Sequence, residues 1–434
     1  KYNEKLTPEC KQVLENRRAA SSTSYTKLAA ILRQVCPDNR LRNQLVFMGS
    51  PRCGRWAGNA VQLHNMARPI EIFEDEVNVD RARALIRAED YEGIQKEFGS
   101  VLLTVKYNIR TSFVAEEGDR FNVCDLKGIE TCVGAWMSEC TPLLNVYLEG
   151  RDAYLDFAVK MTQIPYETLE QDIHSKDKAI KARAKKHRQI AKPAVLGCIY
   201  RLGGGQMGMK KGDPIKQGLW GYAEGYGVSM TQEQAHETVR VFRESYIEIV
   251  KMWFALEKAI KEVLEGTQVK RELGPNGCIK IDKLTFTCNE TQRCVLRIQL
   301  PSGRFLHYMD AMIDEIKMPW QNQEGDDVYK PSFCYAGQDQ TTKQWSYVTS
   351  HGGKVFENID QGISRDVLAN KLLRFEQEGL PVVGHVHDEG ISETEDHPFA
   401  PGLNEMIRIM GEPIDWAPGL PLGSDGFEGS YYHK

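Results

Sequence analysis

The chain has 434 residues, of which 41% are apolar and 26% charged, and its formal net charge at pH 7 is -5. This length suffices for two or three subdomains, and the composition is that of a globular protein. No stretch approaches about 18 uncharged apolar residues, which excludes a membrane-spanning helix. The mild negative charge argues against nucleic-acid binding over the whole surface, but it allows a local basic cleft beside an acidic metal site.

The first residues, Lys1 to Lys5, contain neither a methionine nor an apolar signal core, so we interpret the chain as an excised fragment or a processed product. Its eleven cysteines are an odd number and include no CxxC pair. Cys278, Cys288 and Cys294 also lack zinc-ribbon spacing. We therefore expect reduced thiols in a cytosolic compartment, and not a disulfide framework.

The first third of the chain mixes helical and polar segments. Residues 7–36 carry an interrupted apolar stripe and are predicted to be helical. A polar loop at 49–65 follows, and another helical stretch comes after it. Residues 101–105, with the sequence VLLTV, are predicted to form a short strand. Residues 120–124 are predicted to form a second strand, which ends at Asp125.

The remaining segments are mostly helical, then rich in strands. Residues 151–265 include a basic stretch at 176–192 and one amphipathic helix from about Val239 to Leu264. Pro193 predicts a kink or a helix restart. Residues 268–350 have strand patterns between turn signals. A helix at about 356–378 precedes a strand that begins at Pro381 and runs to Asp388. Helices and strands that do not alternate strictly favour an α+β fold.

Two aspartates, Asp125 and Asp388, each follow an apolar run. Hard oxygen ligands on rigid strands suit a pair of Mg²⁺ ions that bridges a nucleoside triphosphate and an attacking hydroxyl. Either residue considered by itself is better explained as a strand-end acid that caps a turn.

A basic segment carries the second pattern. Arg188, Lys192, Leu196 and Tyr200 recur at four-residue spacing and share a broad helix face. Two cations followed by an apolar and an aromatic side chain suit a triphosphate that carries a base. The alternative is a solvated basic helix face.

The polar loop and its flank carry a third pattern. Its cationic and amide side chains suit contacts to phosphates and groove edges of nucleic acid. These residues are Arg52, Arg55, Gln62, His64, Asn65 and Arg68. An ordinary surface loop is equally compatible with them.

Read together from about Arg17 onward, the segments resemble the family A DNA polymerases of the phage-encoded kind, in the order that the family has them. The resemblance rests on a primer–template element (Cys53 to Arg68), motif A (Asp125 to Glu130), motif B (Arg188 to Tyr200), motif C (Val386 to Glu389) and two phage-type signatures (Leu300 to Arg304, Glu357 to Gln361).

The resemblance implies roles position by position. Two Mg²⁺ ions, replaceable by Mn²⁺, would be held by Asp125, Asp388 and the backbone carbonyl of Leu126. The catalytic residues would be Asp125, Asp388, Glu389 and His387. The nucleotide would contact Arg188, Lys192, Leu196, Tyr200 and Glu130, the last as a gate that selects deoxynucleotides. Primer–template DNA would contact Arg55, Gln62, His64, Asn65, Arg68 and Gln361.

Some positions depart from the family pattern. In motif A, Lys127 and Gly128 stand where Ser and Gln or Ala are usual, and Cys132 stands where Arg is common. His64 replaces a frequent Gln, which puts a minor-groove contact in doubt. Leu196 replaces a usual Phe or Tyr, so we expect altered handling of sugar-modified nucleotides.

The implied architecture is an α+β right-hand polymerase fold, with an antiparallel palm sheet, helical fingers and a thumb that is mostly absent. We expect a thumb remnant at 1–40, the palm at 41–150 and 251–434, the fingers at 151–250, and a strand-rich insertion in the palm at about 268–350. This leaves no room in the chain for a 3′–5′ proofreading exonuclease.

The expected activity is DNA-directed DNA synthesis from a DNA primer and dNTPs with release of pyrophosphate, in the host cytoplasm if the chain is viral. No membrane partner is expected, and accessory replication proteins stay unspecified. A single-subunit RNA polymerase would share the metal acids and the basic helix, but Glu130 and Glu389 favour the DNA enzyme. A non-catalytic replication scaffold would explain only the motif A substitutions. A metal-dependent nuclease would leave the spacing from Arg188 to Tyr200 unexplained.

Overall fold

The computed structural model describes residues 6–20, 24–210, 213–321, 324–339 and 342–433. The chain divides into two compact units. Unit 1 comprises Lys1–Asp125, Asn370–Ile409 and Asp425–Lys434. Unit 2 comprises Leu126–Ala369 and Met410–Ser424. The expected boundaries of thumb, palm and fingers stay a prediction.

A four-stranded sheet organises unit 1. Its order is β12 (Val382–Val386), β13 (Glu389–Glu395), β3 (Asp119–Leu126) and β14 (Ser424–Gly429). β13 pairs antiparallel with both β12 and β3. The predicted strand at 120–124 is therefore correct. Asp388, expected on the strand that begins at Pro381, lies instead in the turn between β12 and β13, because His387 takes a left-handed φ of 56°.

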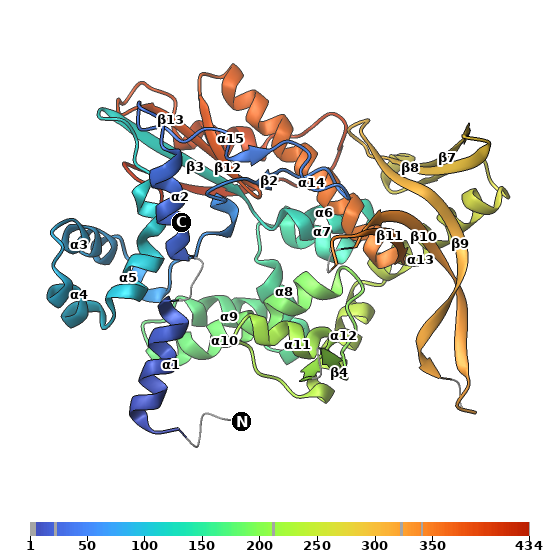
Figure 1. Cartoon of the computed structure of the whole chain (residues 1–434), viewed down its shortest axis with the longest axis horizontal. Coiled ribbons are helices and arrows are strands. Elements are labelled where there is room, and N and C mark those ends of the chain that lie inside the picture. The colour runs from blue at the N-terminus through green and yellow to red at the C-terminus, as the bar shows by residue number, and fades with distance from the viewer. Residues whose placement is uncertain (1–5, 21–23, 211–212, 322–323, 340–341, 434) are drawn as a thin grey trace. The chain divides into compact units, whose positions relative to one another are not determined.

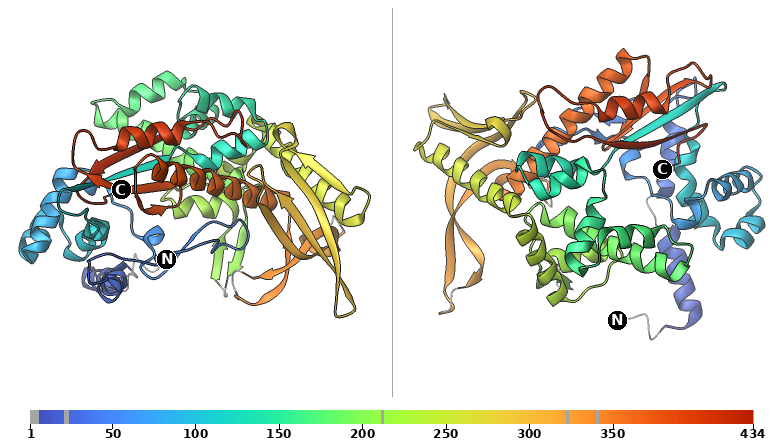
Figure 2. Two further views of the ribbon diagram at one scale, coloured as in Figure 1. Left: turned by 90° about the horizontal axis from the view of Figure 1, so that it is seen from above. Right: turned by 180° about the vertical axis from the view of Figure 1, so that it is seen from behind.

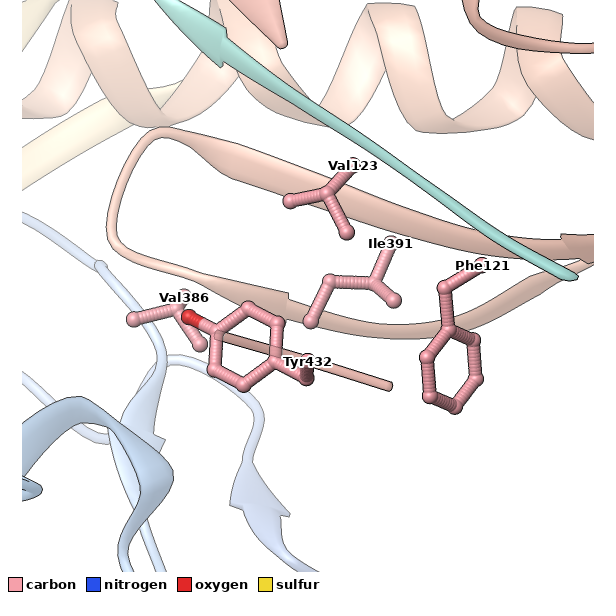
Figure 3. Close-up of a cluster of buried hydrophobic side chains, with 5 residues drawn as sticks. All are labelled: Phe121, Val123, Val386, Ile391 and Tyr432. Carbon is pink, nitrogen blue, oxygen red and sulfur yellow. The ribbon is translucent and has the colours of Figure 1, made fainter. Parts of the chain in front are cut away.

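The two faces of this sheet have different neighbours. Side chains alternate along a strand, so Phe121 and Val123 share a face with Asp125. On this face Phe121, Val123, Val386, Ile391 and Tyr432 form a buried cluster (Figure 3). Elsewhere the sheet lies close to two helices: a Cβ at Gly390 would meet Phe375 of α14 (Gly352–Gln377), and one at Gly426 would meet Leu403 of α15 (Leu403–Gly411).

Helices and short strands make up the rest of unit 1. They are α1 (Pro8–Ala20), α2 (Ser24–Gln34), β1 (Leu45–Val46), β2 (Ala57–Gly58), η1 (Leu63–Asn65), η2 (Glu71–Phe73), α3 (Glu76–Arg87), α4 (Tyr91–Phe98), α5 (Val101–Asn108) and η3 (Ile109–Ser112). The helical prediction for 7–36 agrees with α1 and α2, while residues 21–23 lie outside the described part.

The strand predicted at 101–105 is wrong, because this segment begins α5. Ser100 is its N-cap, and the Ser100 side chain accepts a hydrogen bond from the backbone N–H of Leu103 at 3.3 Å. A serine in this position satisfies one of the free N–H groups of the first helical turn. The cap therefore outweighs the strand preference of the valines in this short segment.

Unit 2 contains a cluster of helices in which α10 packs against its neighbours α8, α9, α11 and α12 (Figure 2). The helices are α6 (Ile129–Met137), α7 (Thr141–Leu148), α8 (Ala153–Thr162), α9 (Tyr166–Ile173), α10 (Lys178–Cys198), α11 (Gly218–Gly225), α12 (Gln232–Ser245) and α13 (Ile247–Glu265). A short hairpin, β4 (Met207–Lys210) and β5 (Asp213–Lys216), follows α10.

One helix prediction is wrong, and of the kink or restart predicted at Pro193 only the restart is excluded. The single helix expected from Val239 to Leu264 is two helices, because Tyr246 leaves the helical region (φ -129°, ψ 55°) with its ring buried beside Phe157 and Phe242. In α10 the helix does not restart at Pro193, which lies inside a continuous helical span. The buried residues Ala191, Ala194 and Val195 around it show that tertiary packing supports this turn.

The strand-rich segment at 268–350 is a six-stranded antiparallel sheet, as expected. Its order runs from β11 to β6, with β9 and β10 forming a long hairpin (Figure 1). The elements are β6 (Lys270–Leu273), η4 (Pro275–Gly277), β7 (Ile279–Cys288), β8 (Thr291–Gln299), β9 (Phe305–Gln321), β10 (Asp327–Gln338) and β11 (Trp345–Ser350). α13 packs against this sheet at β6, β7, β9 and β10. Among the described helices of the whole chain, none is long and apolar enough to cross a membrane.

The contact between Gly390 and α14 generates a stability prediction. A Cβ at Gly390 would lie 2.8 Å from the buried Phe375 ring and 3.2 Å from Leu372. Gly390→Ala should therefore lower the free energy of unfolding by about 1–3 kcal/mol through overpacking, measured by urea denaturation. Gly384→Ala is the matched control, since its Cβ would meet only Ile391 at an ordinary 3.8 Å. Equal stability of the two variants would contradict the prediction.

Candidate active site

The pairing of β3 with β13 brings two of the predicted acids together. Asp125 and Glu389 are Cα partners in the antiparallel register, so both side chains project from the same face. Asp388 precedes Glu389 in the turn. All three acids line one cavity of about 440 Å³ within unit 1. The structure thus assembles acids that lie far apart in the sequence.

The cavity has a mixed lining. Beside these three acids it contains a fourth acid, Glu74, together with cationic, imidazole, aromatic and aliphatic groups, all of them from unit 1. These residues are His64, Arg68, Pro69, Phe73, Glu74, Arg110, Val386, His387, Phe427, Tyr432 and His433. Of the residues predicted from the sequence, Asp125, Asp388, Glu389, His387, His64 and Arg68 meet here.

The acids are suited to a hard divalent cation. Mg²⁺ is commonly held by one or two carboxylates, with waters and substrate phosphates completing its octahedron. Among the described residues, no group of three or more His, Cys, Asp or Glu side chains is placed to hold a metal ion. Asp125 and Asp388 are two carboxylates at one cavity, the number of protein carboxylates that such partial coordination of Mg²⁺ requires. Leu126, whose carbonyl was predicted as a ligand, is the last residue of β3.

Histidines lie beside the acids. The left-handed backbone at His387 places its Nε2–H toward the carbonyl of His64 at 3.2 Å, and the two rings meet edge to face at 4.9 Å. Burial lowers the pKa of His64 to about 4, and the nearby His387 and Arg55 add to this effect. His64 is therefore neutral at pH 7. It contributes hydrogen-bonding capacity to the cavity, and not positive charge.

The other predicted DNA-contact residues lie outside the cavity lining. Gln62 accepts a hydrogen bond from the Asn65 amide at 3.0 Å, and both side chains are exposed next to His64. Arg55 precedes β2, and its backbone carbonyl accepts a bond from Ser50. Gln361 lies on the unit 2 portion of α14.

In unit 2, the two predicted phosphate-binding cations lie on α10. Arg188 donates two hydrogen bonds to Asp152 Oδ2, at 2.6 and 2.8 Å. The ring of Tyr154 lies 5.2 Å from the guanidinium of Arg188 and 5.9 Å from the ammonium of Lys192. Asp152 also caps α8 through its other oxygen. Arg188 thus pairs with the acid that caps α8, and both Arg188 and Lys192 lie near the ring of Tyr154 on α8.

Tyr200, predicted to share a helix face with Arg188 and Lys192, lies instead in the turn that follows α10, between two acids. Its hydroxyl contacts Asp360 of α14 and lies 3.2 Å from Glu130 Oε2 of α6. Burial raises the pKa of Tyr200 well above its usual range, and the charges of Asp360 and Glu130 add to this rise. The hydroxyl therefore stays protonated and can donate to either carboxylate. Leu196 lies one turn before it, half-buried.

Several residues of these sites were missed by the sequence analysis. Arg110, Tyr432 and His433 reach the cavity from segments without a recognisable motif. Asp152 precedes an apolar helical run, a signal that predicts an N-cap but no ion pair with Arg188. Asp360 lies inside the signature from Glu357 to Gln361, but the sequence did not single it out.

The chain is similar to known proteins both in sequence and in structure. No protein-family model matches it. It is 34% identical over 429 residues to a protein named DNA polymerase from Bacillus phage SP02; the match covers 98% of this chain and 57% of that protein. The structure is similar, with a TM-score of 0.54 and 14% identity, to the POL domain of Pol1 from M. smegmatis in complex with DNA primer-template and dNTP; the match covers 100% of this chain and 55% of that one.

The chain thus spans somewhat more than half the length of each of these proteins. The expected α+β class with an antiparallel sheet is confirmed. The recognition made from the motifs is confirmed as well: over nearly its whole length the chain is homologous to a phage DNA polymerase, and it has the fold of a Pol I polymerase domain.

Proposed function

We propose that the chain carries out template-directed DNA synthesis, adding deoxynucleotides to a primer 3′-hydroxyl with release of pyrophosphate. The observation that carries this proposal is the antiparallel register that sets Asp125 opposite Glu389, beside Asp388, in one cavity. The similarity to a phage DNA polymerase and to a polymerase domain bound to primer-template and dNTP supports it. As a phage replication enzyme, the protein would act in the host cytoplasm.

Asp125, Asp388 and the carbonyl of Leu126 would hold two Mg²⁺ ions, or Mn²⁺ in their place. Such ions lower the pKa of the attacking hydroxyl and neutralise charge on the phosphates. The contribution of the protein is to keep hard oxygen ligands on a rigid sheet edge and turn, so that little reorganisation is needed during the reaction. Glu389 and His387 would flank the primer terminus.

Arg188 and Lys192 would bind the triphosphate. Guanidinium and ammonium groups form short, charge-assisted hydrogen bonds with phosphate oxygens. In the structure, Asp152 pairs with Arg188, and Tyr154 lies under both cations. We infer that an incoming triphosphate exchanges with Asp152 as the partner of Arg188. Because this ion pair is partly exposed, breaking it costs little free energy. Exposed ion pairs contribute only about 0–1 kcal/mol of stability.

Glu130 would select the sugar. Its carboxylate lies 3.2 Å from the Tyr200 hydroxyl, so its position is tied to the turn that follows α10. A carboxylate held against the 2′ position would exclude a ribose hydroxyl by its bulk, while Leu196 and Tyr200 would contact the base. Arg55, Gln62, His64, Asn65, Arg68 and Gln361 would contact primer–template DNA, with the arginines on phosphates.

Primer extension tests the proposal. With Mg²⁺, a primed DNA template and dNTPs, the parent should extend the primer, and Asp388→Asn should reduce kcat by more than about a hundredfold, because even the outer neighbours of metal ligands contribute 10–100-fold. Asp396→Asn is the control, since that exposed acid pairs with Arg120 and is absent from the cavity lining. Extension of the parent with rNTPs instead of dNTPs would favour an RNA polymerase. No extension with either would contradict the proposal.

The gate assignment of Glu130 makes a separate prediction. Glu130→Ala should lower the ratio of kcat/KM for dCTP to that for CTP by at least about tenfold, a change of about 1.4 kcal/mol in relative transition-state stabilisation. It should also slow dCTP incorporation, because Tyr200 loses a partner. Glu170→Ala, which changes an exposed acid of α9, is the control. A Glu130→Ala enzyme that rejects CTP as strongly as the parent would remove the gate role.

A further inference from the structure

The end of the chain is fixed against unit 1 by its backbone. The N–H of Ala115 donates to the carbonyl of Ser430, and the N–H of Tyr432 donates to the carbonyl of Phe113, both at 3.0 Å. Tyr431 forms an antiparallel bridge with Val114. In such an extended segment, neighbouring side chains point to opposite sides. The two adjacent tyrosines therefore enter different surroundings.

Tyr432 packs into the core beside the acids. Its ring lies among Phe121, Val123, Val386 and Ile391, with its hydroxyl directed toward Val386 and the turn of the hairpin (Figure 3). The hydroxyl donates to Glu389 Oε1 at 2.7 Å. Both residues are almost completely buried, with 2% of Tyr432 and 3% of Glu389 exposed. Glu389 is thus held by a group from the last five residues of the chain.

Arg110 supports the Tyr432 hydroxyl from behind. Its Nη1 donates to the Tyr432 oxygen at 3.0 Å, while Nε and Nη2 donate to the carbonyls of Ala67 and Met66 at 3.2 Å. Because the oxygen accepts from a cation, its single proton remains available for Glu389. Hydrogen bonds in such chains polarise one another and strengthen.

The hydrogen bond has a geometric consequence. It fixes one carboxylate oxygen of Glu389 and restricts the torsions of its side chain. The acid is thereby held at the cavity lining, next to Asp388.

We propose that Tyr432, supported by Arg110, is a positioning residue that holds Glu389 in the orientation needed for divalent-cation binding and catalysis at the Asp125–Asp388 site. This rests on the proposed polymerase function. Tyr432 itself would touch neither substrate nor metal; it would act through Glu389.

The adjacent tyrosine provides a matched control. Tyr431 also donates its hydroxyl to a carboxylate, Asp80 at 2.9 Å, and packs under the guanidinium of Arg83. Tyr431 is absent from the cavity lining. Tyr432→Phe and Tyr431→Phe therefore each remove one hydroxyl of one buried ring, but only the first disturbs Glu389.

Two measurements test the inference on the full chain. Mn²⁺ binding to the enzyme alone, followed by electron paramagnetic resonance of the free ion, should weaken about 10–100-fold in Tyr432→Phe, the range for partners of metal-site residues. In primer extension, the same variant should lose kcat and need more Mg²⁺ for half-maximal rate, with the KM for dNTP nearly unchanged. Tyr431→Phe should match the parent in both.

The outcomes separate the two proposals. If Tyr432→Phe binds Mn²⁺ as the parent does and has the same Mg²⁺ dependence, or if both variants change equally, the positioning role is overturned. If the parent does not extend primers but Tyr432→Phe still weakens Mn²⁺ binding, the polymerase proposal fails, while the positioning of Glu389 by Tyr432 is supported.

Discussion

The antiparallel register between β3 and β13 is the constraint on which the candidate catalytic cavity depends. Side chains alternate along each strand, so a slip of one residue would turn Asp125 or Glu389 to the opposite face. The register is fixed from both faces. Val123 opposes Ile391 in the buried cluster, the Asn122 amide donates to Thr394 at 2.8 Å, and Gly390 leaves room for Phe375 of α14. Apolar packing and one buried polar pair thus determine where the acids project, although none of these groups takes part in chemistry.

A second theme is how charged side chains are held. In unit 1, Arg110 donates a hydrogen bond to the Tyr432 hydroxyl, which in turn donates one to Glu389. In unit 2, Asp152 accepts two hydrogen bonds from Arg188, whose guanidinium also faces the Tyr154 ring. Both arrangements suit the proposed ligands. A site for cations needs its acid fixed in place, whereas a site for a triphosphate needs its cation kept in place by a partner that can be exchanged. Both arrangements orient charge before the substrate arrives, which lowers the reorganisation required during the reaction.

Much of this could be predicted from the sequence, because the helices, the strand-rich segment and the motif spacing are local signals. The predictions that were wrong have identifiable physical causes. A serine cap turns 101–105 into helix, a buried Tyr246 splits a long amphipathic pattern in two, and a left-handed His387 moves Asp388 from strand to turn. The contact between Arg110 and Tyr432 joins residues 322 positions apart without a motif at either end. Only the folded sheet brings such residues together, so no local pattern could have indicated them.

The local structure accounts for two of the departures from the family pattern in motif A, at Gly128 and at Cys132. Gly128 has a left-handed φ of 54°, and a Cβ there would lie 3.0 Å from the Tyr147 hydroxyl, which donates to the Gly128 carbonyl at 3.2 Å. Glycine is therefore the residue that this turn accepts at least strain. Cys132 is buried and donates to the carbonyl of Pro421 at 2.9 Å; burial raises the pKa of its thiol, and the nearby charge of Asp360 adds to the rise. A neutral thiol thus occupies a position where the family commonly has arginine, and Asp360 contacts the Tyr200 hydroxyl. That contact gives the buried acid a hydrogen-bond donor. The same hydroxyl lies 3.2 Å from Glu130 Oε2, so Tyr200 links both acids within unit 2.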